Sequence, residues 1–290
     1  MSKTGTERPA STAEEEICFQ QIGHGPPLLL LHGLLGGSFC WRFNLQAFSR
    51  RHTVFALDFP GLGKHVASRQ LDCSMDAQAD RLVSLLEKLE LPSVDVIAPS
   101  WGGAIAIFLA ARSKLVRSLV LVAPVNPWSD FGSGRIQFLR GRVGGAMLHL
   151  MMPLSRPVHS IAMQRMYGDP LRVPEGTVEG YSSQILLPGR THNVLSSLRC
   201  WDKDIAALRT AIPQVKARSL LVWGTRDGAV DIRSAEFLKQ ALQDCELAVI
   251  EGAGHLPFEE TPETFNKLVL EFLERHVEEG SIEATVKDRL

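Results

Sequence analysis

The sequence predicts an α/β fold with a mostly parallel sheet that is flanked by helices. Short runs that are apolar throughout, such as residues 28–31 and 119–123, are typical of strands buried on both faces of a parallel sheet. Segments with a helical period separate these runs, as the connections between parallel strands require. From residue 124 to 212 the alternation stops and amphipathic helical stretches follow one another. This break indicates a separate helical segment, inserted after the strand at 118–123.

The pattern divides the chain into a core, a cap and two tails. Residues 17–123 and 213–280 are expected to form the core and residues 124–212 the cap, while residues 1–16 and 281–290 are expected to be loose tails. Core strands are expected at 17–19, 28–31, 53–57, 94–98, 118–123, 219–223 and 246–250. Helices are expected at 74–89, from Ser100 onward, at 232–242, from Thr261 to Gly280, and in the cap at 136–150, 158–167, 178–187 and 194–208.

Composition excludes several classes of protein. The formal net charge is −1, and no basic run is long enough to indicate nucleic acid or an anionic membrane surface as a partner. The longest apolar runs are too short to span a membrane. The five cysteines are scattered and form no metal-binding or disulfide pattern, which favours a reducing compartment. Because the acidic N-terminal segment lacks the apolar core of a signal peptide, we expect a cytoplasmic protein.

The stretch around Ser100 predicts a strand, a sharp turn and a helix. The mostly apolar residues 94–98 precede the serine, and two glycines and a long run of helix formers follow it. A serine at the apex of such a turn takes a strained backbone conformation that holds its hydroxyl clear of the sheet. Strand and helix approach closely there, so the residues two positions before and after the serine must be small. Ala98 and Gly102 meet this requirement.

Three further motifs follow predicted strands: His32-Gly33, Gly224-Thr225-Arg226-Asp227 and Gly254-His255. With Ser100, they resemble the α/β-hydrolase family, in which nucleophile, acid and histidine occur in this order. The resemblance covers residues 17–277 and implies a mostly parallel, eight-stranded sheet with a helical cap inserted after the sixth strand. The motifs depart from the family pattern at Ala98, where Gly-x-Ser-x-Gly has its first glycine. Serine at position 100 separates the chain from the epoxide hydrolases and haloalkane dehalogenases of the same fold, which use aspartate there.

The resemblance implies a catalytic triad. Ser100 would be the nucleophile, His255 its general base and later the acid for the leaving group, and Asp227 the residue that orients the imidazole. The backbone N–H groups of Leu34 and Trp101 would form the oxyanion hole. No metal and no organic cofactor is implied. Since the carboxyl ends of parallel strands share one edge of a sheet, these distant residues are expected to meet there.

Three other polar residues are interpreted as structural. His32 is expected to brace the loop that it begins, although the same position could be proposed as catalytic. Asp58 lies in an Asp-x-Pro-Gly-x-Gly turn, and we interpret it as turn-forming. Asp231 precedes the helix expected at 232–242 and is interpreted as its N-cap.

The cap is expected to cover Ser100 and to form the wall of the substrate pocket. Five of the seven methionines lie in it, and flexible methionine suits a surface that fits varied apolar ligands; the same residues could instead pack the interior of the cap. The residues expected to line the pocket are Leu35, Pro99, Met147, Met151, Met163, Met166 and Leu256. Arg135, Arg140 and Arg142 are interpreted as a solvated face rather than a site for an anionic substrate group.

The function that these features favour is hydrolysis of carboxylic esters with small to medium apolar groups, through an acyl-enzyme. The alternative is a hydrolase that cleaves carbon–carbon bonds in diketones from aromatic breakdown. Cap groups such as Arg190 or His192 would decide between the two reactions. A cofactor-free haloperoxidase or perhydrolase is a lesser option, and a ligand receptor with little turnover is a third class. The expected partner is a small apolar ester, with no nucleic acid and no membrane span, for a monomer or homodimer.

Overall fold

The computed structural model describes residues 6–10, 17–63, 71–129, 133–152 and 156–287. Eight strands within these ranges form one sheet in the order β1-β2-β4-β3-β5-β6-β7-β8. The β1–β2 and β2–β4 pairs are antiparallel, and the other pairs are parallel. The predicted fold class is therefore confirmed. The strands are β1 Thr6–Ala10, β2 Ile17–Ile22, β3 Pro27–Leu30, β4 Thr53–Asp58, β5 Val94–Pro99, β6 Val116–Val122, β7 Arg218–Gly224 and β8 Cys245–Ile250.

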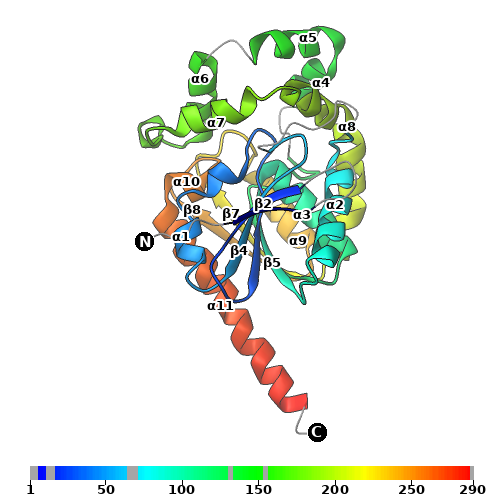
Figure 1. Cartoon of the computed structure of the whole chain (residues 1–290), viewed down its shortest axis with the longest axis vertical. Helices are drawn as coiled ribbons and strands as arrows, with labels where there is room; N and C mark the ends of the chain where they lie inside the picture. Colours follow the sequence, from blue (N-terminus) through cyan, green and yellow to red (C-terminus); the bar gives the residue numbers. More distant parts are fainter. Residues whose placement is uncertain (1–5, 11–16, 64–70, 130–132, 153–155, 288–290) are drawn as a thin grey trace.

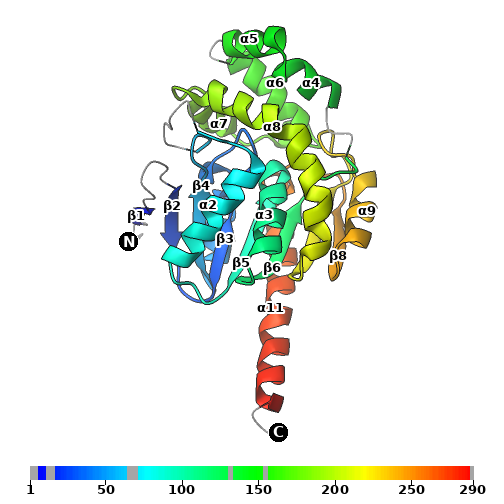
Figure 2. The same cartoon turned by 90° about the vertical axis from the view of Figure 1, so that its right-hand side faces the viewer.

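Helices cover both faces of the sheet (Figures 1 and 2). One face carries α2 (Met75–Lys88), α3 (Ser100–Arg112), α8 (Arg190–Ala211) and α9 (Arg233–Ala241). The other face carries η1 (Ser38–Trp41), α1 (Leu45–Phe48), α10 (Pro257–Glu260) and α11 (Pro262–Lys287). The remaining helices are α4 Ser133–Arg140, α5 Arg142–Met151, α6 Arg156–Met166, η2 Pro170–Arg172, α7 Thr177–Ile185 and η3 Ile212–Gln214.

The central strands are buried on both faces, as their continuous apolar runs predict. In β6, Leu119 and Leu121 belong to the hydrophobic core beneath α2 and α3, whereas Val120 and Val122 belong to the core beneath α11. All four side chains are inaccessible to solvent. The alternation follows from the two-residue period of a strand, which sends successive side chains to opposite faces.

The structure differs from the sequence prediction at both tails, since each contains regular secondary structure. Within residues 1–16, Thr6–Ala10 form β1, which pairs with β2 and becomes the edge of the sheet. At the other end, α11 continues through Gly280 to Lys287 instead of ending at the glycine. A single glycine inside a helix costs only about 1 kcal/mol, and the helix formers that follow it allow the helix to continue.

The segment between β6 and β7 is helical, and we call residues 133–211 the helical insertion. The one helix predicted at 136–150 is two helices, α4 and α5, because Gly141 takes an extended conformation between them. At its far end, α8 runs down to the core and packs against α2 and α3. The last turns of α8 therefore belong to the core layer rather than to the cap.

Among the described residues, the structure contains no helix long and apolar enough to cross a membrane.

Candidate active site

Ser100 occupies the sharp turn between β5 and α3 that the sequence predicts. Its φ angle is +51°, in the left-handed region that non-glycine residues rarely adopt. The turn depends on close packing, because a Cβ at Gly102 would lie 2.3 Å from the carbonyl oxygen of His32. The Ser100 side chain remains partly accessible although both adjoining residues are buried. A strained serine that is still exposed is typical of an enzyme nucleophile.

Asp227 and His255 meet across the ends of β7 and β8. The Nδ1 of His255 donates a hydrogen bond to Oδ2 of Asp227 at 2.9 Å. The other carboxylate oxygen, Oδ1, accepts the backbone N–H groups of Ala229 and Val230 at 2.8 and 3.0 Å. Because the carboxylate is fully buried and both of its oxygens are occupied, its orientation is fixed. With Nδ1 protonated, the Nε2 of His255 is the nitrogen left to act as a base.

The loop after β3 lies against the serine turn. A Cβ at Gly33 would lie 3.7 Å from the Cβ of Ser100. The N–H of Gly36 donates to the carbonyl of Gly33, which makes Leu34 and Leu35 the centre of a tight turn. Trp101 is in the first turn of α3, where backbone N–H groups have no partner within the helix. Leu34 directly follows Gly33, and Trp101 directly follows Ser100, so both predicted oxyanion donors belong to segments that adjoin the serine.

His32 braces this loop against its neighbour. Its Nε2 accepts the N–H of Phe59 at 3.0 Å, and its Nδ1 donates to the carbonyl of Gly33 at 2.7 Å. Complete burial lowers the pKa of His32 to about 4, so the ring is neutral at physiological pH. Asp58 on the same turn accepts the backbone N–H and the hydroxyl of Ser38. Both residues have the structural contacts that the sequence interpretation expects.

The helical insertion lies over the carboxyl ends of the strands. The Nδ2 of Asn193 on α8 donates to the carbonyl of Gly61, in the loop after β4, at 3.2 Å. The carbonyl of Met166, at the end of α6, accepts the N–H of His255 at 2.7 Å. A Cβ at Gly254 would lie 2.5 Å from the same carbonyl oxygen. The insertion is therefore in direct contact with the loop that carries His255.

Two adjacent carboxylates hold this contact together. Glu259 accepts hydrogen bonds from the hydroxyls of Tyr167 and Tyr181 and forms an ion pair with Arg42 at 2.8 Å. Burial raises the pKa of Glu259, while Arg42 and the hydrogen bonds oppose that shift. The carboxylate of Glu260, which is also buried, accepts the N–H groups of three residues from both sides of the junction: Gly168, Asp169 and Gly254.

Sequence reasoning missed this junction. The only local signal is a pair of glutamates directly after the His255 loop and beside Phe258, at positions that turn out to be buried. Charged side chains are almost never fully buried without partners, but most partners here come from the residues directly after η1 and α6 and from α7, which are distant in sequence.

The predicted pocket residues separate into two groups. Met163, Met166 and Leu256 lie together in the hydrophobic cluster that contains Phe258, and Met166 contacts His255. Pro99 is buried beside Ser100 at the end of β5. By contrast, Met147 and Met151 belong to neither of the two hydrophobic clusters of the described residues. They lie on the exposed side of α5, and Leu35 is exposed at the tip of its turn.

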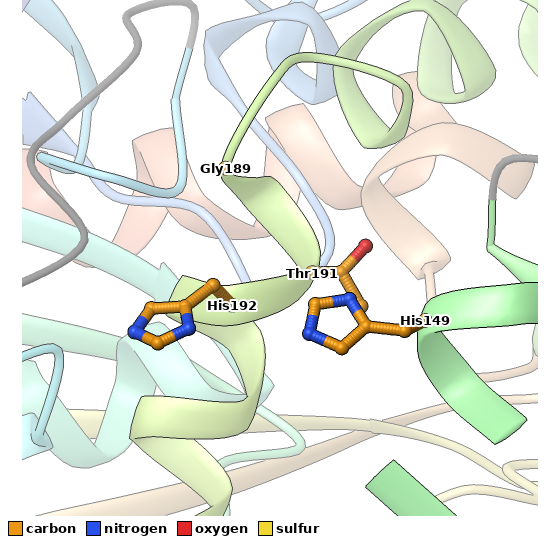
Figure 3. A pocket seen from close by; sticks show the side chains of 4 residues that line it. All are labelled: His149, Gly189, Thr191 and His192. Carbon is orange, nitrogen blue, oxygen red and sulfur yellow. The ribbon is translucent and has the colours of Figure 1, made fainter. Parts of the chain in front are cut away.

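Two hollows are lined mainly by residues of the helical insertion, and Ser100, Asp227 and His255 line neither of them. One, of about 210 Å³, is lined by His149 from α5 and by Gly189, Thr191 and His192 at the start of α8 (Figure 3). The other, of about 410 Å³, lies between α4 and α8 and includes Trp201. Within the described residues, no three His, Cys, Asp or Glu side chains gather as a metal site requires.

The fold and the arrangement of these loops define a class of protein. The chain belongs to the alpha/beta hydrolase family, whose model matches residues 28–268. The resemblance read from the sequence is thereby confirmed.

Individual relatives share this fold with modest identity. Human monoacylglycerol lipase ABHD6 is 24% identical over 256 residues, which cover 87% of this chain and 76% of that protein. The epoxide hydrolase CorEH superimposes with a TM-score of 0.81 at 22% identity, covering 93% of this chain and 99% of the other. The meta-cleavage product hydrolase CumD of Pseudomonas fluorescens IP01 gives a TM-score of 0.77 at 22% identity, covering 90% and 95%. Because the named activities differ, the reaction must be argued from the residues of the site.

Proposed function

We propose that the protein is a serine hydrolase that cleaves carboxylic esters of small to medium apolar groups. The observation that carries this proposal is a strained, accessible Ser100 on the same sheet edge as a buried, hydrogen-bonded Asp227–His255 pair. Family membership and the lipase named among the relatives support it.

The mechanism follows from the chemistry of these groups. A serine hydroxyl becomes a useful nucleophile only when a base removes its proton, and Nε2 of His255 is the available nitrogen. Asp227 holds the productive tautomer and stabilises the imidazolium that forms. The ester carbonyl becomes a tetrahedral oxyanion, which the N–H groups of Leu34 and Trp101 bind; each such donor contributes about 3 kcal/mol in hydrolases of this kind. His255 then protonates the leaving alcohol, and water hydrolyses the acyl-enzyme.

One observation favours carbon–carbon bond hydrolysis as the second candidate. Arg190 is buried at the start of α8, where Nε donates to the carbonyl of Gln184 and one terminal nitrogen donates to Gly63. Within the part of the chain that the structure describes, the other terminal nitrogen, Nη1, has no hydrogen-bond partner, and the carbonyl oxygen of the Gln184 side chain also has none. Unpartnered polar atoms next to the loop after β3 fit a substrate that carries its own carboxylate and keto groups.

The test compares the wild type with Ser100→Ala and with Ser183→Ala, a control serine exposed on α7. Wild type and Ser183→Ala are expected to be labelled by a fluorophosphonate probe and to hydrolyse p-nitrophenyl esters. Ser100→Ala is expected to lose labelling and at least about 10⁴-fold in kcat. The chain-length optimum from acetate to decanoate then measures the depth of the pocket. Labelling without ester turnover, combined with cleavage of vinylogous diketones, would select the second candidate; an unlabelled but folded wild type would contradict both.

A further inference from the structure

Helix α5 turns an apolar stripe away from the protein. Its inner side contains Gly144 and Gly145, which pack against the backbone of α4 and against Leu195 of α8. Its outer side presents four large apolar residues, 41–75% exposed: Val143, Met147, Leu150 and Met151. These positions are spaced i, i+4, i+7 and i+8, so they fall within an arc of roughly 100° on a helix. The inner side already packs α5 onto the molecule, so the outer stripe has no role in that packing.

The neighbouring helix extends this surface. Phe138 on α4 is about half exposed, and a Cβ at Gly144 would lie 2.1 Å from its carbonyl oxygen, so α4 and α5 are tightly packed there. We call the set Phe138, Val143, Met147, Leu150 and Met151 the outer apolar patch. It belongs to the helices at the top of Figures 1 and 2, at the opposite end of the molecule from α11. Clustered apolar exposure of this kind marks an interaction site.

The charge of the surrounding segment identifies the kind of partner. Residues 133–166, from the start of α4 to the end of α6, contain five arginines and no aspartate or glutamate, so the rest of the chain is net acidic. Arg142 and His149 are exposed on α5 beside the apolar stripe, and Arg165 is exposed on α6. Arg140 is paired with Asp202 of α8 and adds less. An apolar helix face bordered by cations is the pattern of helices that lie in the interface of an anionic bilayer.

We propose that the outer apolar patch docks onto a lipid bilayer that contains anionic phospholipids. The five side chains would enter the boundary between headgroups and acyl chains, and Arg142 would remain at the level of the phosphates, its stem on the apolar surface and its guanidinium in water. A second copy of the chain fits this face poorly, because a two-fold contact would bring the two arginine-rich segments together. The proposal does not depend on the reaction at Ser100.

The consequence for the molecule is one of orientation. The same insertion contacts the loops around His255 and Gly61, so docking through α5 would hold the site edge of the sheet toward the lipid. An apolar substrate that partitions into the bilayer would then be delivered at the insertion rather than from bulk water.

Vesicle flotation of the full chain tests the proposal. The wild type is expected to float with vesicles of phosphatidylcholine and phosphatidylglycerol, less with phosphatidylcholine alone, and less again at high salt. Leu150→Ser and Arg142→Glu are each expected to weaken the partition coefficient by about ten-fold. The matched controls are Phe237→Ser on α9 and Lys216→Glu before β7, both at exposed positions outside the insertion, and neither is expected to change binding.

Three outcomes would overturn the proposal. The first is a wild type that does not float with anionic vesicles. The second is flotation that falls equally in the Leu150 variant and in the Phe237 control. The third is a dimer, measured by light scattering, that Leu150→Ser converts to a monomer, since the patch would then be covered by a second copy. Unchanged thermal unfolding of each variant excludes loss of fold as the cause.

Discussion

The sheet and the helical insertion bury their apolar residues in different ways. In β5, β6 and β7 almost every side chain is buried, on both faces. In α5 the buried side contains two glycines while four large apolar side chains face outward. The insertion is joined to the core in part through buried polar groups, above all Glu259 and Glu260. The sheet therefore holds the candidate catalytic residues, and the insertion combines contacts with the His255 loop and an outer surface that packs against nothing described.

The largest expected effect concerns the core side of this comparison. Asp227→Asn should lower kcat for p-nitrophenyl esters by about 10⁴-fold, because the amide favours the wrong tautomer of His255. Stability should change little, since the amide oxygen can still accept the N–H groups of Ala229 and Val230. Asp231→Asn is the control: that carboxylate is hydrogen-bonded to Arg233, and the variant should keep full activity. Equal loss in both variants would show that Asp227 is not the acid of the triad.

Glycine substitutions compare the packing of the two regions directly. Gly102→Ala should lower the free energy of unfolding by about 3 kcal/mol, because the new methyl group collides with the carbonyl of His32. Gly134→Ala in α4, where a Cβ would meet nothing within 4 Å, should raise it by about 0.5 kcal/mol through helix propensity. Urea titrations measure both values. A neutral Gly102→Ala would mean that the start of α3 and the loop after β3 are farther apart than described.

The junction between the two regions should give an intermediate effect. Tyr181→Phe removes a donor from the buried carboxylate of Glu259 and should cost about 2 kcal/mol, since a charged acceptor loses a hydrogen bond without gaining water. Ser183→Ala, two residues later and exposed, should be neutral. If both variants unfold at the wild-type urea concentration, Glu259 is not what joins the insertion to the core.

The smallest expected effect is a pH dependence at Asp204, where α8 of the insertion contacts the start of α2 through the N–H of Met75. Burial raises the pKa of Asp204 on α8 from 3.8 to about 6, so between these values the folded state binds a proton that the unfolded state releases. The contribution of Asp204 to the free energy of unfolding therefore falls as pH rises through this window. Asp204→Asn lacks the effect. Its free energy of unfolding relative to that of the wild type should therefore increase by about 1 kcal/mol from pH 4 to pH 6, allowing for solvent screening.

Thermal unfolding of wild type, Asp204→Asn and the exposed control Asp202→Asn at several pH values checks this sign. A stability of Asp204→Asn that falls relative to the wild type toward pH 6 would contradict the raised pKa of Asp204.

The fold was the most predictable part of the protein, and the insertion the least. Most core strands could be located because they are largely apolar runs, and the candidate triad residues because each follows such a run within a short motif. The break at Gly141 and the exposure of Met147 and Met151 could not be predicted, because helical periodicity does not report a change of direction or which stripe faces the core. The net charge of −1 likewise averages over the chain and conceals the arginine-rich segment of α4 to α6.

The sequence by itself determined the class of fold, the order of Ser100, Asp227 and His255, and the presence of a helical segment before β7. These features follow from local patterns, namely the periods of strands and helices and motifs of a few residues. Only the tertiary structure decided that Glu259 and Glu260 join the insertion to the His255 loop, and that α5 shows its apolar side to the outside. The physical reason is that burial of a charge or an apolar stripe depends on partners distant along the chain, which no local pattern contains.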